Sequence, residues 1–499
     1  MSKLRTLDCL DVPGWTGRIG GQSGRHAKVT RSIWYNPVPW VIIAVVVTWV
    51  ILMARQVPCI PVSVHPYTRL CYSDVPILYW NKSIIWSGGP LYSTNPVDSA
   101  TELEYPVLIG GFIWLARWLS GLFGAVVSPL ATTDDRVSAS VTFWAVTALL
   151  LFVCFCVLVW AHLQMGRDSA TQYSGGTRTR AWDALFIAAA PVVMLAGLIN
   201  WDMLAVALTS VALLLWARQH PIWAGVVIGL AAAVKFYPLA MIAVFFLLCL
   251  RAGCLKKWGV FMAGGVVAWL AVNLPVLLTT PQAWAVFWVY NAQRGADFGS
   301  LWFVLTQLGV PLSADVVSII GALGLAIGGG IIVGLVLSAP RRPRVGQVAL
   351  LVMVVFLVVN KVYSPQYVLW LLPLVVLARP VMYDLLVFTV AEAMYYFAVW
   401  GYLAGALGPV GGPAPMYYLA VLLRIGVQLW LAKRVVDDMM HPWFDPVRGP
   451  FIDDPIGGVL NHAPDAAWML RAPARRAPLE PPEPLDPPAQ RAQRAAEEP

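Results

Sequence analysis

Charged residues are scarce in this sequence of 499 residues, whereas apolar residues are abundant. Charged side chains make up 12% of the chain and hydrophobic ones 59%, while an ordinary soluble domain is about one-quarter charged. Together with a mean hydropathy of +0.70, this excludes an ordinary soluble domain and predicts an all-α, polytopic membrane protein. The net charge of +8 is no reason to expect a nucleic-acid partner, because the lysines and arginines gather in loops between apolar runs.

Other signals are missing as well. The seven cysteines show no metal-ligand spacing, and no internal repeat is visible. The first 30 residues lack the apolar core and cleavage site of a secretory signal, so we expect 1–37 to be a cytoplasmic tail. From His441 onward there is no further apolar run, and the sequence becomes rich in Pro, Ala, Arg and Glu. We expect 437–499 to be a second cytoplasmic tail, largely disordered, at least from Ala472.

Apolar runs fill the chain between these tails. Basic residues gather at alternate connections between the runs, which places both termini in the cytoplasm. The sequence therefore predicts a transmembrane bundle over 38–436 with about 12 spans and a large first outer loop over 55–137. The expected spans cover residues 38–54, 138–162, 182–199, 203–217, 223–234, 238–250, 258–278, 314–337, 348–360, 367–378, 381–401 and 415–436.

One apolar run, 105–123, is long enough to span the bilayer but does not fit this order. Counting it gives 13 spans and puts the polar outer loops on opposite faces, so we interpret it as an interfacial helix with Arg117 facing water. The 13-span alternative fails only on the charge bias. Several spans, such as 223–234 and 367–378, are shorter than the ~20 residues that a bilayer requires, which predicts a cavity in the outer leaflet.

The first outer loop contains a helix start beside an acidic residue. Ser73 is a typical N-cap, Asp74 is the first residue of the expected helix, and the apolar residues up to Trp86 suit a helix in the membrane interface. The positive end of the helix dipole favours an ionised Asp74, as a general base or a metal ligand requires. On the local pattern alone, a simple capping role for Asp74 is the more economical interpretation.

The predicted topology collects further polar residues on the same outer face. Ionisable groups at the ends of short spans are costly, so together they indicate a functional site. Taken singly, Lys235 or Lys361 fits an interface anchor and Asp202 fits a helix cap. The outer strings are Asn-Trp-Asp (200–202), Lys-Phe-Tyr-Pro (235–238), Arg-Gly-Ala-Asp-Phe-Gly-Ser (294–300) and Lys-Val-Tyr-Ser-Pro-Gln-Tyr (361–367), joined by Asp74, Glu102 and Glu104.

These strings carry a family resemblance over roughly residues 38–436. The chain resembles integral-membrane glycosyltransferases of the GT-C superfamily, and among them the actinobacterial polyprenyl-phosphate-mannose-dependent α-mannosyltransferases of the glycosyltransferase family 87 type. The resemblance implies a first outer loop with two interfacial helices, an early catalytic aspartate at Asp74 and a lipid-linked sugar donor. Position 74 has no tandem Asp-Asp or Asp-Xaa-Asp pattern, so the motif does not support a bound metal and we expect no cofactor; a divalent metal ion is the alternative.

The expected reaction is one inverting displacement that moves a sugar, mannose above all, from a polyprenyl phosphate to a cell-envelope glycolipid or polysaccharide on the outer face of the plasma membrane. We expect Asp74 to be the general base. Trp302, Trp370 and Tyr367 are candidates for a stacking wall, and equally for interface aromatics. The expected donor-phosphate ligands are Arg294, Lys235 and Lys361, and the expected sugar or acceptor ligands are Glu104, Asp202, Asp297, Gln366 and Tyr237.

Three other functions fit the sequence less well. The first is a decaprenyl-phosphate-arabinose-dependent arabinofuranosyltransferase, which only the overall likeness of the sequence separates from a mannosyltransferase. A transporter or flippase for an anionic lipid-linked sugar also needs cations beside a cavity, but the spans show no inverted repeat and the charges lie on one face. A noncatalytic scaffold has the least support.

Two residue pairs complete the predictions. Cys59 and Cys71 flank a short segment of the outer loop, where thiols oxidise, and we expect a disulfide between them; two separate thiols are the alternative. Glu392 and Arg424 lie at matching depths in the last two spans, so we expect a buried ion pair with Gln428 one turn further in. The alternative is that each faces the cavity separately.

Overall fold

The chain folds into a bundle of helices. The computed structural model describes residues 36–60, 65–89, 91–92, 101–171, 180–448 and 453–470, and no strand occurs within these ranges. The predicted tail 1–37 lies outside them except for its last two residues. The α-helices are α1 (Pro37–Gln56), α2 (Asp74–Asn81), α3 (Ser83–Trp86), α4 (Val107–Leu122), α5 (Thr133–Thr171), α6 (Leu185–Ala188), α7 (Pro191–Ala196), α8 (Asp202–Ala217), α9 (Pro221–Val234), α10 (Ala240–Ala252), α11 (Leu255–Thr279), α12 (Pro281–Gln293), α13 (Leu301–Gln307), α14 (Ala314–Ser338), α15 (Val345–Val358), α16 (Val368–Ala378), α17 (Met382–Leu403), α18 (Pro415–Met440) and α19 (Ala467–Leu470).

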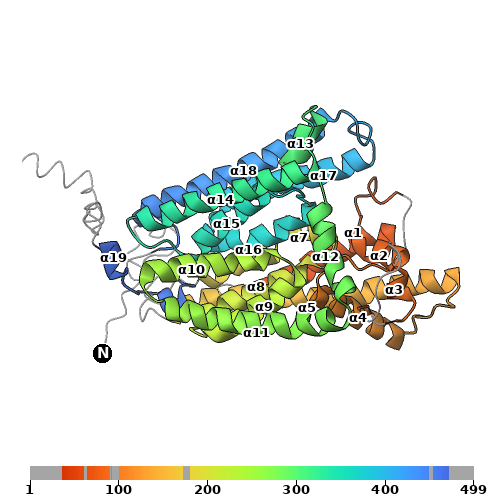
Figure 1. Cartoon of the computed structure of the whole chain (residues 1–499), viewed down its shortest axis with the longest axis horizontal. Coiled ribbons are helices and arrows are strands. Elements are labelled where there is room, and N and C mark those ends of the chain that lie inside the picture. Colours follow the sequence, from red (N-terminus) through yellow and green to blue (C-terminus); the bar gives the residue numbers. More distant parts are fainter. Residues whose placement is uncertain are drawn as a thin grey trace, which may run out of the picture.

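The bundle has two distinct ends. The long helices run lengthwise, α12 crosses them at the end that carries α2 and α3, and α19 lies at the opposite end (Figure 1). We call these the α2 end and the α19 end. Five helices are long and apolar enough to cross a bilayer, and six further apolar helices of 10–17 residues accompany them in the described part of the chain. The protein is therefore an all-helical membrane protein.

The run expected over 182–199 is broken rather than continuous. A 3₁₀ turn over Arg180–Ala184 leads into α6, and α7 begins at Pro191 after the extended residue Ala190. Proline lacks an N–H group and disfavours the helical conformation of the residue before it, which explains the break. Residues 197–201 then form a non-helical connection to α8, and this connection reaches the α2 end.

Glycines bring α9 and α11 into close contact. A Cβ atom at Gly225 would lie 1.8 Å from the carbonyl oxygen of Phe261, and one at Gly229 would lie 2.2 Å from that of Gly265. Small residues four apart allow this approach of two helix backbones, as is common among membrane helices. The packing fixes the course of α9, which ends at Val234 with Lys235 as its C-cap.

The run 105–123 forms α4, but the prediction that Arg117 faces water is wrong. Arg117 is only 5% exposed. Its guanidinium donates to the carbonyl oxygens of Gly89 at 2.7 Å and Ile84 at 3.2 Å. The end of α3 leaves carbonyl groups without helical partners, and this arginine satisfies them from inside the fold.

Both predicted pairs are confirmed. Cys59 and Cys71 form a disulfide with a Cα–Cα distance of 5.8 Å. Arg424 Nε lies 2.9 Å from Glu392 Oε2, and Gln428 donates to the other carboxylate oxygen at 2.6 Å. Arg424 also donates to the carbonyl oxygen of Tyr363 at 2.9 Å, so the pair fixes part of the loop before α16.

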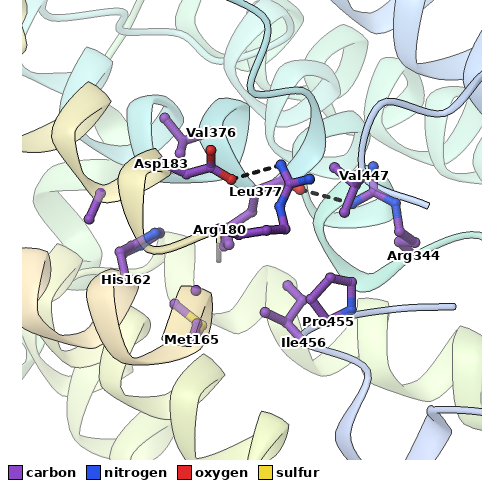
Figure 2. A pocket seen from close by; sticks show the side chains of 12 residues that line it. His162, Met165, Arg180, Asp183, Arg344, Val376, Leu377, Val447, Pro455 and Ile456 are labelled. Atoms are coloured by element: carbon purple, nitrogen blue, oxygen red, sulfur yellow. Dashed lines mark hydrogen bonds and ion pairs between the residues drawn. The ribbon is translucent and has the colours of Figure 1, made fainter. Parts of the chain in front are cut away.

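The α19 end is closed by residues that follow α18. Asp445 accepts two hydrogen bonds from the buried Arg344 guanidinium, at 2.8 and 2.9 Å, and Asp465 pairs with the buried Arg251 at 2.8 Å. Ordered contacts therefore extend well past residue 437, whereas the disorder expected from Ala472 concerns residues outside the described ranges. A cavity of about 30 Å³ remains beside Arg344 (Figure 2), with room for only a few water molecules.

Candidate active site

A cavity of about 720 Å³ opens at the α2 end. Its wall is built from the loop before α2, the start of α4, the connection from α7 to α8, the residues after α9, the end of α12 and the loop between α15 and α16. Seven of the nine predicted site residues line it, and the other two, Asp202 and Asp297, lie behind them. The seven are Asp74, Glu104, Lys235, Tyr237, Arg294, Lys361 and Gln366.

Asp74 is held in place by its backbone. It begins α2, and the Ser73 side chain accepts from the N–H of Val75 at 3.3 Å, as predicted for an N-cap. Ser73 Oγ donates to Leu198 at 2.6 Å, and the N–H of Asp74 donates to Ile199 at 2.7 Å, both to carbonyl oxygens. The start of α2 is therefore tied to the connection that leads into α8.

Two side chains orient the Asp74 carboxylate, and the sequence interpretation assigned a role to neither. Tyr72 OH donates to Oδ1 at 2.8 Å, and Asn200 Nδ2 donates to Oδ2 at 2.7 Å. The Asn200 amide also lies 3.0 Å from Tyr105 OH. The Asn-Trp-Asp string (200–202) had indicated that this segment belongs to the site. It did not show that Asn200, its first residue, binds the Asp74 carboxylate.

Burial and hydrogen bonding act on the pKa of Asp74 in opposite directions. Burial raises the pKa of the Asp74 carboxyl, while the hydrogen bonds from Tyr72 and Asn200 and the charge of Lys235 lower it; the net direction is upward. A carboxylate of raised pKa is a stronger proton acceptor, which suits a general base.

Lys235 and Asp202 form a charged unit at the wall. Lys235 is the C-cap of α9, and its Nζ lies 3.5 Å from Asp202 Oδ1. The Asp202 side chain is fully buried and accepts a hydrogen bond from Trp370 Nε1 at 2.9 Å. Asp202 therefore positions Lys235 and Trp370 from behind, and the ammonium is the part of this unit that reaches the cavity.

Arg294 and Lys361 form a second cationic unit. Arg294 Nε donates to Asp297 at 2.9 Å, and the side chain keeps 34% of its surface exposed. The segment 294–297 is joined to the loop that contains Lys361, because the N–H of Asp297 donates to the carbonyl oxygen of Lys361 at 2.9 Å. Lys361 Nζ itself donates to the Asn291 carbonyl at 3.0 Å and to Ser318 Oγ at 3.0 Å, so it also ties its loop to the end of α12.

The remaining predicted ligands differ in how many contacts they already make within the protein. Glu104 pairs with Lys82 at 3.0 Å. The Oε1 atom of Gln366 accepts no hydrogen bond from the described residues. Tyr237 stacks on Trp370 with ring centroids 4.5 Å apart, and Tyr367 stacks on the same indole at 3.9 Å.

Trp302 does not belong to the wall. Its indole N–H donates to the carbonyl oxygen of Val359 at 3.0 Å, and the ring is buried away from the cavity. A second aromatic group that the sequence analysis did not single out does line the cavity, namely Tyr67, Tyr72 and Trp400. Within the described residues, no group of three or more His, Cys, Asp or Glu is placed to hold a metal ion.

The model of glycosyltransferase family 87 matches residues 107–360, about half of the chain. No curated protein matches the sequence. The matched region includes Asn200, Lys235 and Arg294 but begins after Asp74, so the assignment of Asp74 rests on its position in the cavity. With this match, an all-helical membrane fold and a polar cavity at one end, the chain belongs to glycosyltransferase family 87.

Proposed function

We propose that this glycosyltransferase moves mannose from a polyprenyl phosphate to a glycolipid or polysaccharide of the cell envelope. The observation that carries the proposal is that a hydrogen-bonded carboxylate, Asp74, and two cations, Lys235 and Arg294, line one cavity of about 720 Å³. The bundle crosses the plasma membrane about 12 times, with the α2 end outside and both termini in the cytoplasm.

The reaction is a single displacement at the anomeric carbon. An acceptor hydroxyl oxygen forms a bond to C1 of the donor sugar while the bond from C1 to the phosphate oxygen breaks, and the configuration inverts. The acceptor proton passes to Asp74, and the bonding electrons leave with the polyprenyl phosphate. Tyr72 and Asn200 hold the two carboxylate oxygens, so the base is oriented before the acceptor arrives.

The leaving phosphate gains negative charge in this step, and cations stabilise it. Arg294 offers a planar guanidinium that matches phosphate oxygens, whereas Lys235 supplies a compact charge. Lys361 already donates to protein groups, so we assign it a weaker contact with the phosphate and a larger part in holding the loop. The chemistry of these residues requires no metal ion and no other cofactor.

The donor sugar lies beside the aromatic stack of Tyr237, Trp370 and Tyr367. Gln366 lines the cavity and is assigned to a sugar hydroxyl, because its Oε1 accepts no hydrogen bond from the described residues. Glu104, which pairs with Lys82 through Oε1, also lines the cavity and is assigned to a second hydroxyl. Asp202 and Asp297 act from behind, through Lys235 and Arg294. An arabinofuranose donor would use the same residues, and the transfer assay distinguishes it from a mannose donor.

The test measures transfer by the purified full-length protein. Radiolabelled polyprenyl-phosphate-mannose and a lipid extract as acceptor should give a labelled glycolipid with the wild-type protein. Asp74→Asn should lower kcat by about 10²–10⁴, because an amide cannot take up the proton, and should leave the thermal stability unchanged. Near-normal turnover by Asp74→Asn would overturn the assignment of the base. Transfer from the arabinose donor but not from the mannose donor would show that arabinose is the sugar transferred.

A further inference from the structure

Three aromatic rings form a stack on the cavity wall. The ring centroids of Tyr67 and Tyr72 are 5.3 Å apart, those of Tyr67 and Trp400 are 5.7 Å apart, and those of Tyr72 and Trp400 are 4.9 Å apart. Tyr67 and Tyr72 come from the segment before α2, and Trp400 comes from the far part of α17. All three line the 720 Å³ cavity.

This stack adjoins the base and is distinct from the other aromatic group. Tyr72 OH donates to Asp74 at 2.8 Å. The stack of Tyr237, Trp370 and Tyr367 instead adjoins Asp202, which accepts from Trp370 and pairs with Lys235. One cavity therefore has an aromatic wall at its carboxylate and another at its cations.

The wall at the carboxylate is rigidly mounted. The disulfide joins Cys71, the neighbour of Tyr72, to Cys59 just after α1. The carbonyl oxygen of Leu70 accepts from Tyr396 OH at 2.8 Å and from the Arg55 guanidinium. Arg55 also donates to Met194 O at 3.0 Å, so the segment is anchored to α1, α7 and α17. A surface fixed in this way is preorganised for a ligand.

We propose that Tyr67, with the buried Trp400 packed behind it, forms the binding subsite for the acceptor, a hexopyranoside whose apolar ring face packs on Tyr67 while its hydroxyl reaches Asp74. This subsite rests on the proposed function and defines its second substrate. Aromatic faces carry the negative part of a quadrupole, and the C–H bonds of a pyranose face carry partial positive charge. An acceptor must meet the base, and Tyr72 of this wall donates a hydrogen bond to that base.

The experiment uses the full-length enzyme, polyprenyl-phosphate-mannose as donor and octyl α-D-mannopyranoside as acceptor probe. Tyr67→Ala should raise the acceptor KM about tenfold, equivalent to about 1.4 kcal/mol, while the donor KM stays within about twofold. Tyr67→Phe should keep the wild-type acceptor KM, because stacking does not need the hydroxyl. Donor hydrolysis, in which water replaces the acceptor, should be unchanged in both variants.

Tyr383→Ala is the matched control, because Tyr383 also belongs to the described helices but is 65% exposed and lies outside the cavity wall. Its two KM values should match the wild type. An unchanged acceptor KM in Tyr67→Ala, or a rise in the donor KM, would overturn the subsite while leaving the proposed function intact. Wild-type transfer to the lipid extract but not to octyl mannopyranoside would overturn the pyranoside class. A wild-type protein that transfers sugar to neither acceptor would defeat the proposed function itself.

Discussion

The two ends of the bundle use the same residue types for different purposes. At the α19 end, Arg344 and Asp445 enclose each other, both side chains are at most 1% exposed, and only about 30 Å³ of space remains nearby. At the α2 end, Arg294 and Asp297 also pair, but the arginine is 34% exposed on a cavity of about 720 Å³. An arginine whose donors all meet protein atoms stabilises the fold, whereas one that keeps donors on a cavity remains available to a ligand.

The largest expected effect is a loss of stability at the α19 end without a loss of activity at the α2 end. Arg344→Ala removes both guanidinium hydrogen bonds from the buried Asp445, which keeps only the longer contact of 3.6 Å with Arg448 as an ion pair, and should lower the free energy of unfolding by about 3 kcal/mol. The protein that remains folded should keep its transfer activity. Thermal unfolding in detergent, followed by size-exclusion chromatography, measures the first quantity, and turnover per folded molecule measures the second.

The control for Arg344 is Lys433→Ala, which removes an exposed pair with Asp437 and should change stability by less than about 1 kcal/mol. The double variant Arg344→Met with Asp445→Leu should recover part of the lost stability, because the two paired charges are removed together and Arg448 keeps Asp453 at 3.9 Å. If Arg344→Ala were as stable as the control, the α19 end would not be held by this pair.

A smaller effect is expected at the α2 end, and it concerns kinetics. Arg294→Ala should lower kcat/KM for the donor by about 10²-fold, because a charged hydrogen bond to the phosphate is lost, while the melting temperature stays close to that of the wild type. Initial rates over a range of donor concentrations measure this. Arg218→Ala removes an exposed arginine that pairs with Asp168 and serves as the control. Unchanged donor kinetics in Arg294→Ala would make Arg294 a structural residue like Arg344.

The smallest effect tests the orientation of the base. Tyr72→Phe removes a donor that lowers the Asp74 pKa, so this pKa should rise further above its ordinary value. The base works only when deprotonated, and activity is lost as the pH falls through its pKa. The acidic limb of the pH profile of kcat/KM should therefore move to higher pH, with about a tenfold loss of kcat at neutral pH.

Tyr79→Phe is the matched control for Tyr72, since Tyr79 lies on α2 and its hydroxyl has no hydrogen-bond partner among the described residues. Its pH profile should equal that of the wild type. A Tyr72→Phe profile that coincides with the control would show that Asn200 alone sets the protonation of Asp74.

Local signals carried the sequence analysis furthest. The Ser73 cap, the start of α2 at Asp74 and the disulfide between Cys59 and Cys71 follow from patterns within a few residues, and all are confirmed. The Glu392–Arg424 pair followed from the cost of an unpaired charge inside a membrane, which acts at any sequence distance.

Contacts between distant segments were harder to predict. Asn200 meets Asp74 across 126 positions, and no periodicity encodes which amide turns toward a carboxylate. Charge alone placed Asp202 and Asp297 in the site, but it could not show that each lies behind a cation. The prediction for Arg117, and the wall alternative for Trp302, failed because a polar atom is satisfied by carbonyl groups that only the folded chain brings near. The number of spans and the outer position of the cavity stay predictions.

The guanidinium of Arg424 has a mechanical consequence. It holds the Glu392 carboxylate and the Tyr363 carbonyl at once, and it lies between the rings of Tyr363 and Tyr395, 3.6 and 4.2 Å from their centroids. These contacts link α17, α18 and the loop 361–367, so that a movement of the two helices is transmitted to the loop. A change in bilayer thickness that tilts these helices should therefore displace Lys361 and Gln366 at the cavity with them.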